Sequence, residues 1–117
     1  MSLAIVPDPD APPARPAARL AGPLDRETSP SLERWLDGHL ARDDVRAILL
    51  DLSGLTALTA AGAGVFLGRA PMGEERGVRL LLYGLPAPLA AKAALYGLPD
   101  LVGLHPDRPA ADALCPP

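Results

Sequence analysis

The hydroxyl groups of Thr56 and Thr59 stand just before a run of small residues that has the pattern of a helix start. Thr59 is a good helix N-cap, and small apolar residues follow it from Ala60 to Leu67. The first turn of a helix exposes backbone N–H groups and the positive end of the helix dipole. A phosphate or an acidic group of another protein would be held well there. The sequence therefore predicts binding chemistry at this turn.

Other side chains that could do chemistry are too scattered to form an active site. His39 and His105 lie far apart in the chain, and Cys115 is the sole cysteine. No His/Cys/Asp spacing matches a zinc site, and the glycine fingerprints of nucleotide-binding loops are missing. The carboxylates that could in principle gather around a divalent cation are Asp25, Asp43, Asp44 and Asp51. We predict that the protein is not an enzyme and needs no metal and no cofactor.

A buried strand and a helix must position the Thr59 turn. The apolar run from Ile48 to Leu50 predicts a central strand over residues 46–52 that is covered on both faces, and Ser53-Gly54 should end it. In the helix that follows, Pro71 removes a backbone donor and predicts a kink, and Gly77 is the expected stop.

The remaining elements are predicted from apolar periodicity and from glycine and proline. We expect strands at 3–6, 19–21, 78–83 and 101–104, a turn at 22–25, and helices at 28–40, 89–96 and 107–114. Leu80 to Leu82 should be fully buried. Leu32, Leu36 and Leu40 form an apolar helical stripe, and Trp35 beside it is either packed at the stripe's edge or an anchor for a partner. Strands separated by helices of this size indicate a largely parallel sheet.

The stretch from Asp51 to Phe66 resembles the signature of the STAS domain family, which includes bacterial anti-sigma factor antagonists and the cytoplasmic tails of sulfate transporters. The family's Asp-Leu-Ser-Gly strand end is present at 51–54. Its later Asp-Ser-Ser-Gly-Leu-Gly corresponds to residues 59–64, and its Leu-x-x-x-Gly-Leu appears at 93–98 as Ala-Ala-Leu-Tyr-Gly-Leu.

This resemblance implies an α/β fold: a small four- or five-stranded, mixed but largely parallel sheet with helices packed mainly on one face. It covers residues 15–114, which we expect to form the STAS-like domain. Residues 1–14 would add an N-terminal edge strand and a proline-rich hairpin, so that the chain is a single domain overall.

The resemblance also places a partner-binding surface. In the family, the first Ser of the signature is phosphorylated by a partner anti-sigma kinase, and Ala60 stands at that position here. Carried over position by position, the surface that contacts the partner consists of Asp25, Thr56, Thr59, Ala60, Ala61, Gly62 and Ala63. The implied partner is an anti-sigma factor of the kinase-like ATPase type, and the implied role is transcription regulation in a bacterium.

Because Ala60 has no hydroxyl, three interpretations stay open. The protein binds its partner constitutively and escapes phosphorylation. Alternatively, Thr59 or Thr56 accepts the phosphate. In the third interpretation the loop senses a small ligand or nucleotide, or the domain is a scaffold that pairs with other STAS domains in a larger assembly or transporter complex; a weak homodimer belongs to this group.

Composition narrows the class of partner. The net charge of −3 and the lack of a basic cluster argue against nucleic-acid binding. No apolar stretch approaches the ~18 residues of a membrane helix, which argues against membrane insertion. A single cysteine cannot form an internal disulfide, and the N-terminus lacks the pattern of a signal peptide. We expect a cytoplasmic protein.

Overall fold

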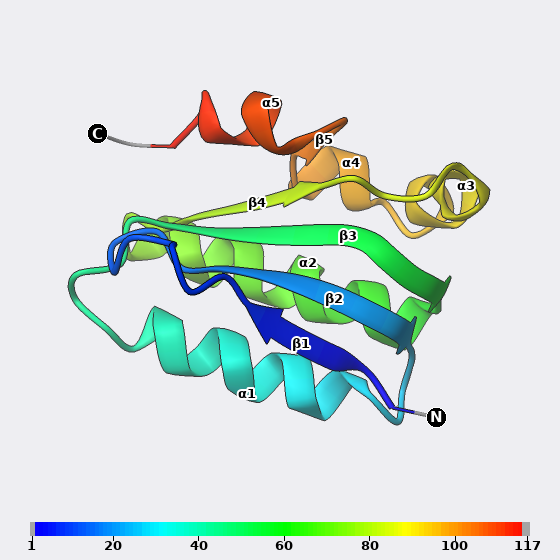
Figure 1. Ribbon diagram of the computed structural model, residues 1–117. Coiled ribbons are helices and arrows are strands. Elements are labelled where there is room, and N and C mark those ends of the chain that lie inside the picture. Colours follow the sequence, from blue (N-terminus) through cyan, green and yellow to red (C-terminus); the bar gives the residue numbers. More distant parts are fainter. Residues whose placement is uncertain (1, 116–117) are drawn as a thin grey trace.

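The computed structural model describes residues 2–115 as a five-stranded mixed sheet with the strand order β1-β2-β3-β4-β5 (Figure 1). The strands are β1 (Ala4–Pro7), β2 (Ala17–Leu24), β3 (Ala47–Leu58), β4 (Arg79–Tyr83) and β5 (Leu104–His105). The helices are α1 (Ser29–Leu40), α2 (Ala60–Glu75), α3 (Ala87–Leu95), α4 (Leu98–Leu101) and α5 (Arg108–Asp112). β1 pairs antiparallel with β2, and the other neighbours are parallel. The predicted fold class is confirmed.

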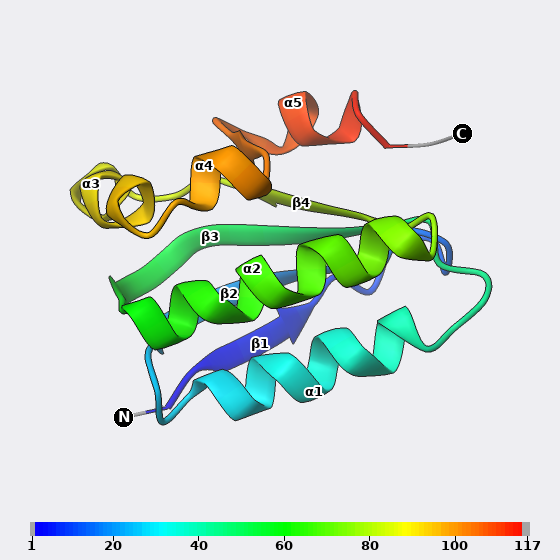
Figure 2. The ribbon, with the colours of Figure 1, turned by 180° about the vertical axis from the view of Figure 1, so that it is seen from behind.

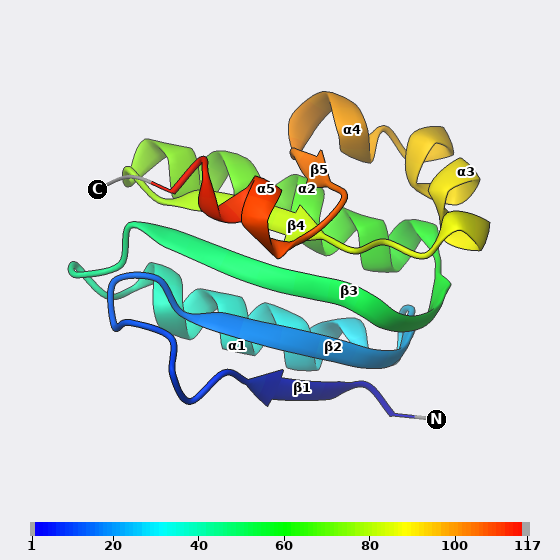
Figure 3. The same ribbon diagram turned by 45° about the horizontal axis from the view of Figure 1, so that its top comes forward.

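The two long helices cover one face of the sheet, as Figure 2 shows from behind and Figure 3 from above. The main core lies between that face and the helices. It includes Ile48 and Leu50 of β3 and the α1 stripe of Leu32, Leu36 and Leu40, all at most 5% exposed. On the opposite face α5 covers a smaller core around Leu49 and Leu81. Residues 48–50 are thus buried on both sides, as predicted.

β2 and β3 are longer than the sequence predicts. The turn expected at 22–25 is instead the end of β2, and Ser53-Gly54 does not end β3. Pro23 is tolerated because it lies beyond the stretch that pairs with β1 and next to a register shift. A Cβ at Gly54 would collide with the Leu20 carbonyl oxygen, so this glycine marks a close approach of two strands and not a turn.

α2 continues through Pro71, where the sequence predicts a kink, and Gly77 follows its end with a left-handed φ of 75°. Pro71 lies on the exposed side of the helix. Water can therefore hydrate the Leu67 carbonyl, whose helical donor the proline lacks.

The end of the chain differs most from the prediction. The strand expected at 101–104 is present only at its last residue: Leu101 ends the short helix α4, Val102 and Gly103 belong to neither element, and β5 is only Leu104–His105. A short apolar run cannot be assigned to helix or strand by periodicity alone. Because β5 pairs only with Leu82 and Tyr83, it leaves the first half of β4 without an outer neighbour. Leu80 is consequently half-buried, while Leu81 and Leu82 are buried as predicted.

Candidate functional site

The C-terminal ends of two neighbouring parallel strands bring the predicted site residues together. β2 and β3 are paired up to Leu24 and Leu58, so the turns that follow them lie side by side, near the right edge of Figure 1. The Thr59 N–H donates to the Leu24 carbonyl (3.1 Å) and ties the two turns together. Asp25 and Thr59, which are far apart in the chain, therefore border one surface.

Asp25 is the organising residue of the first turn. Its carboxylate accepts hydrogen bonds from the backbone N–H groups of Glu27 (2.9 Å) and Thr28 (3.0 Å). The Thr28 hydroxyl donates to the Pro23 carbonyl (2.9 Å) and accepts from the Asp25 N–H (3.0 Å). Thr28 occupies the N-cap position of α1, but its side chain makes no capping bond because the turn uses it. These bonds give the turn a fixed shape ahead of α1.

Thr59 caps α2, as its sequence context predicts. Its hydroxyl oxygen accepts a hydrogen bond from the Gly62 N–H at 3.3 Å, and its extended backbone (φ −107°, ψ 171°) is that of an N-cap residue. The hydroxyl therefore has a structural role in the helix start. Ala60 and Ala61 follow on the exposed side of the first turn.

Gly62 and Ala63 lie behind the surface. Both are buried, and Ala63 is 0% exposed. A Cβ on Gly62 would come within 2.8 Å of the Leu24 Cγ atom and 2.9 Å of the Leu24 carbonyl carbon. Only glycine therefore lets α2 approach the end of β2 this closely, and these two residues position the first turn of α2.

The two turns enclose a shallow, open depression that is lined by Asp25, Arg26, Glu27, Thr59, Ala60 and Ala61. Four of these were predicted as site residues. Sequence reasoning missed Arg26 and Glu27, although their place directly after Asp25 was a usable signal. Thr56 is exposed on β3 but does not line the depression. The surface combines one cation, two anions and two methyl groups, and its openness favours contact with another macromolecule over enclosure of a small ligand.

α1 and α2 are held together beside this surface by an ion-pair cluster. The Arg69 guanidinium of α2 lies 3.0 Å from the Glu33 carboxylate and 3.1 Å from the Asp37 carboxylate of α1. The pKa of Arg69 is raised, chiefly by its hydrogen bond to Asp37. The pair fixes the spacing of the two helices, and with it the position of the first turn of α2 against the Asp25 turn.

The predicted edge residue Trp35 is half-buried against the main core. Its ring meets the His39 ring edge-on, with 4.4 Å between ring centroids. Desolvation, followed by the nearby Arg42 charge, lowers the pKa of His39. Packing at the edge of the α1 stripe therefore accounts for Trp35.

Among residues 2–115 no group of three or more His, Cys, Asp or Glu side chains could hold a metal ion. Within the same part of the chain, no helix is both long and apolar enough to span a bilayer.

Comparison with known proteins decides the family. The family model described as "Mlab, STAS domain" matches residues 8–103. The chain belongs to the STAS domain family. An anti-sigma F factor antagonist of Paenibacillus polymyxa is 29% identical over 87 residues, which are 74% of either chain.

Two solved STAS structures have the same fold. An anti-sigma factor antagonist from Mycobacterium paratuberculosis superposes with a TM-score of 0.74 at 21% identity, covering 95% of this chain and 92% of its own. The STAS domain of a SulP transporter from Vibrio cholerae gives a TM-score of 0.68 at 20% identity, with coverages of 88% and 82%. The STAS domain described here is a regulatory module, and its curated relatives are antagonists of anti-sigma factors.

Proposed function

We propose that this STAS domain is a non-catalytic, cytoplasmic antagonist that binds an anti-sigma factor of the kinase-like ATPase type. The contact surface is the depression between the Asp25 turn and the first turn of α2. One observation carries the proposal: two rigidly hydrogen-bonded turns present an open surface, and Ala60 lines it at the position where the family signature has a phosphorylated serine. An open surface of mixed charge suits a protein partner, which can cover it completely.

The same geometry supports constitutive binding. A phosphate adds nearly two negative charges and disrupts a contact that the unmodified domain makes. Ala60 cannot accept one. The neighbouring Thr59 hydroxyl already accepts the capping bond from Gly62 and is half-buried. We therefore assign Thr59 a capping role. Thr56 lies outside the depression.

The test is affinity capture from the native host, with wild-type and variant proteins in parallel. Ala60→Asp places a negative charge in the lining of the depression, and Ala113→Asp places the same charge at an exposed alanine outside it. We expect mass spectrometry to identify an ATPase-fold anti-sigma factor with the wild type and with Ala113→Asp, and to lose it with Ala60→Asp. An anti-sigma factor captured equally by all three proteins would place the contact elsewhere. No anti-sigma factor in any sample would refute the proposed function.

A second candidate, a scaffold subunit in a larger assembly, is favoured by the outer face of α3. Its residues Ala87, Ala90, Ala91, Ala94 and Leu95 are all exposed at helical spacing, and Leu95 is 79% exposed. A helix that is apolar on both faces is normally covered. This candidate predicts that STAS domains or transporter subunits co-purify with the protein, and that Leu95→Glu releases them while Ala60→Asp does not.

A further inference from the structure

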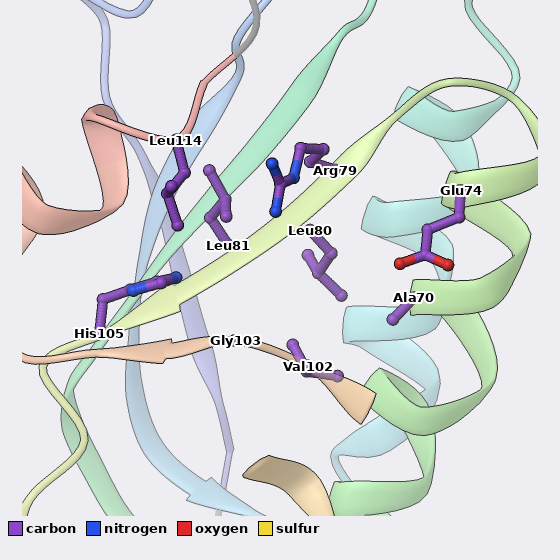
Figure 4. A pocket seen from close by; sticks show the side chains of 9 residues that line it. All are labelled: Ala70, Glu74, Arg79, Leu80, Leu81, Val102, Gly103, His105 and Leu114. Carbon is purple, nitrogen blue, oxygen red and sulfur yellow. The ribbon is translucent and has the colours of Figure 1, made fainter. Parts of the chain in front are cut away.

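The unpaired half of β4 borders a cavity that is separate from the Asp25–Thr59 depression. It has a volume of about 90 Å³ and is lined by Ala70, Glu74, Arg79, Leu80, Leu81, Val102, Gly103, His105 and Leu114. Figure 4 shows Ala70 and Glu74 of α2 at one side of β4, and Leu114 and His105 at the other. The cavity therefore extends along the edge of the sheet and is bounded on both faces.

The backbone at this edge lacks a partner. On β4, the N–H of Leu82 donates to the Gly103 carbonyl (3.4 Å), and beyond it the N–H of Gly84 donates to the His105 carbonyl (3.1 Å). The N–H of Arg79 donates the other way, to the Arg46 carbonyl beside β3. Because these directions alternate along a strand, the N–H and C=O of Leu80 point outward, into the line that β5 would occupy if it were longer. Among residues 2–99 and 102–115, no backbone or side-chain group bonds to either of them there.

Side chains around the cavity are also unpaired. The Nε2 atom of His105 is buried without a hydrogen-bond partner, and the His105 ring lies over Gly103, where a Cβ would be 2.8 Å from Nε2. Among the side chains of residues 2–99 and 102–115, neither Glu74 nor Arg79 has an ion-pair partner within 4.0 Å. A buried polar atom without a partner calls for a missing one. One occupant could satisfy all of these groups.

We propose that this edge of β4 binds an extended peptide segment of a partner protein by strand addition. A polypeptide backbone offers a donor and an acceptor at the spacing of the open ladder. Side chains of an added strand alternate between the two faces. On the α2 face, an aliphatic side chain would fill the space beside Ala70, Leu80 and Val102. On the α5 face, the next side chain would be acidic, facing the Arg79 guanidinium and accepting a hydrogen bond from His105 Nε2.

Charge fixes the order of the two residues. Arg79 has the same orientation as Leu81, toward α5, whereas Glu74 projects from α2 on the other face. An acidic side chain on the α2 face would meet Glu74 and be repelled. The recognised segment is therefore an extended aliphatic–acidic pair in one register, and the register shifted by one residue is disfavoured on both faces.

The proposal is tested by selecting phage-displayed random peptides of about eight residues on the wild-type protein and counter-selecting on Arg79→Glu. Arg34→Glu is the matched control, because Arg34 is an exposed arginine of α1 outside the cavity. We expect enriched peptides to contain aliphatic–acidic alternation. Fluorescence anisotropy should show at least about fivefold weaker binding to Arg79→Glu and unchanged binding to Arg34→Glu.

Two further measurements distinguish strand addition from side-chain contact alone. N-methylation of the peptide backbone should abolish binding at alternate positions only, because every second N–H faces β4. The bound peptide should also slow hydrogen exchange of the Leu80 amide. The proposal is overturned if no peptide is enriched on the wild type over Arg79→Glu. It is equally overturned if enriched peptides bind without the alternating N-methyl effect and without protection of Leu80.

Discussion

Two glycines in the first turns of α2 should respond in opposite ways to the same substitution. In Gly62→Ala, the added Cβ meets the Leu24 carbonyl group and Cγ atom, all under 3.0 Å. In Gly64→Ala, nothing lies within 4 Å of the new Cβ. Both changes replace a poor helix former by the best one. The two variants therefore differ in packing against β2 and hardly at all in helix propensity.

The magnitudes follow from these contacts. The helix propensity of alanine over glycine stabilises each variant by about 1 kcal/mol. Overpacking at Gly62 opposes this by about 1–3 kcal/mol. The upper part of that range applies, because the obstacle is a backbone carbonyl in a paired strand and cannot rotate away. We expect Gly62→Ala to lose about 1–2 kcal/mol of unfolding free energy and Gly64→Ala to gain about 1 kcal/mol.

Urea and thermal unfolding measure both effects. For a domain of this size, about 1 kcal/mol corresponds to about 4 °C in Tm. Gly62→Ala should thus melt at least about 8 °C below Gly64→Ala. If Gly62→Ala melts at or above Gly64→Ala, α2 does not depend on a close approach to Leu24. The account of how the site is positioned would then fail, because the same contact sets the first turn of α2 against the Asp25 turn.

Three further predictions concern the site and its surroundings. Thr59→Ala should lower the unfolding free energy by about 1 kcal/mol, because the Gly62 N–H loses its capping acceptor. Thr59→Asp should keep most of the wild-type unfolding free energy, because its carboxylate can accept the same bond. Equal losses for the two variants in urea unfolding would argue against capping. Ala60→Ser with Thr59→Asp should create a phosphoacceptor for a captured kinase-type partner, detected by mass spectrometry, and persistent resistance despite binding would contradict the proposed surface. The lowered pKa of His39 means that the unfolded chain binds a proton more readily than the folded one. The contribution of neutral His39 to the unfolding free energy is complete above the ordinary histidine pKa of about 6.5 and is lost as the pH falls below it. The unfolding free energy of His39→Gln should therefore decrease less than that of the wild type between about pH 7.5 and about pH 5. The same pH profile of unfolding free energy for both proteins would contradict the lowered pKa.

Strong local signals made the centre of the fold predictable. These signals are the apolar run at Ile48–Leu50, the stripe of Leu32, Leu36 and Leu40, and the cap at Thr59. The structure confirms them. The family signature at 51–64 adds the topology, which these local patterns cannot specify by themselves.

The prediction failed where glycine and proline have more than one use. Gly54 and Pro23 were expected to mark turns, but both lie within paired strands, one at a close approach and the other at a register shift. Which use applies depends on the neighbouring strand, which a single stretch of sequence does not contain. Likewise, the burial of Gly62 and Ala63 became visible only once the position of Leu24 was known.

The site itself was predictable in part for a geometric reason. Adjacent parallel strands end at the same edge of a sheet, so residues that follow β2 and β3 must meet. This rule brings Asp25 and Thr59 together and would have added Arg26 and Glu27. It does not include Thr56, which precedes the end of β3 and lies outside the depression.

α2 links the two surfaces that we assign to partners. Its first turn, at Thr59 to Ala61, borders the Asp25 depression, and its later turns, at Ala70 and Glu74, border the open edge of β4. Ala60 lines the first surface and has no hydroxyl group that could be phosphorylated. If this surface binds constitutively, its occupancy is set by partner concentration and by whatever changes affinity through the rest of the domain.

A peptide on the β4 edge would contact the same helix. If it shifts α2 against β2, it must change the affinity of the first surface, and by linkage the partner there must change the affinity for the peptide by the same factor. Reciprocal titrations of peptide and partner, each in the presence of the other, would measure that factor, and equal affinities throughout would show that the two surfaces act independently.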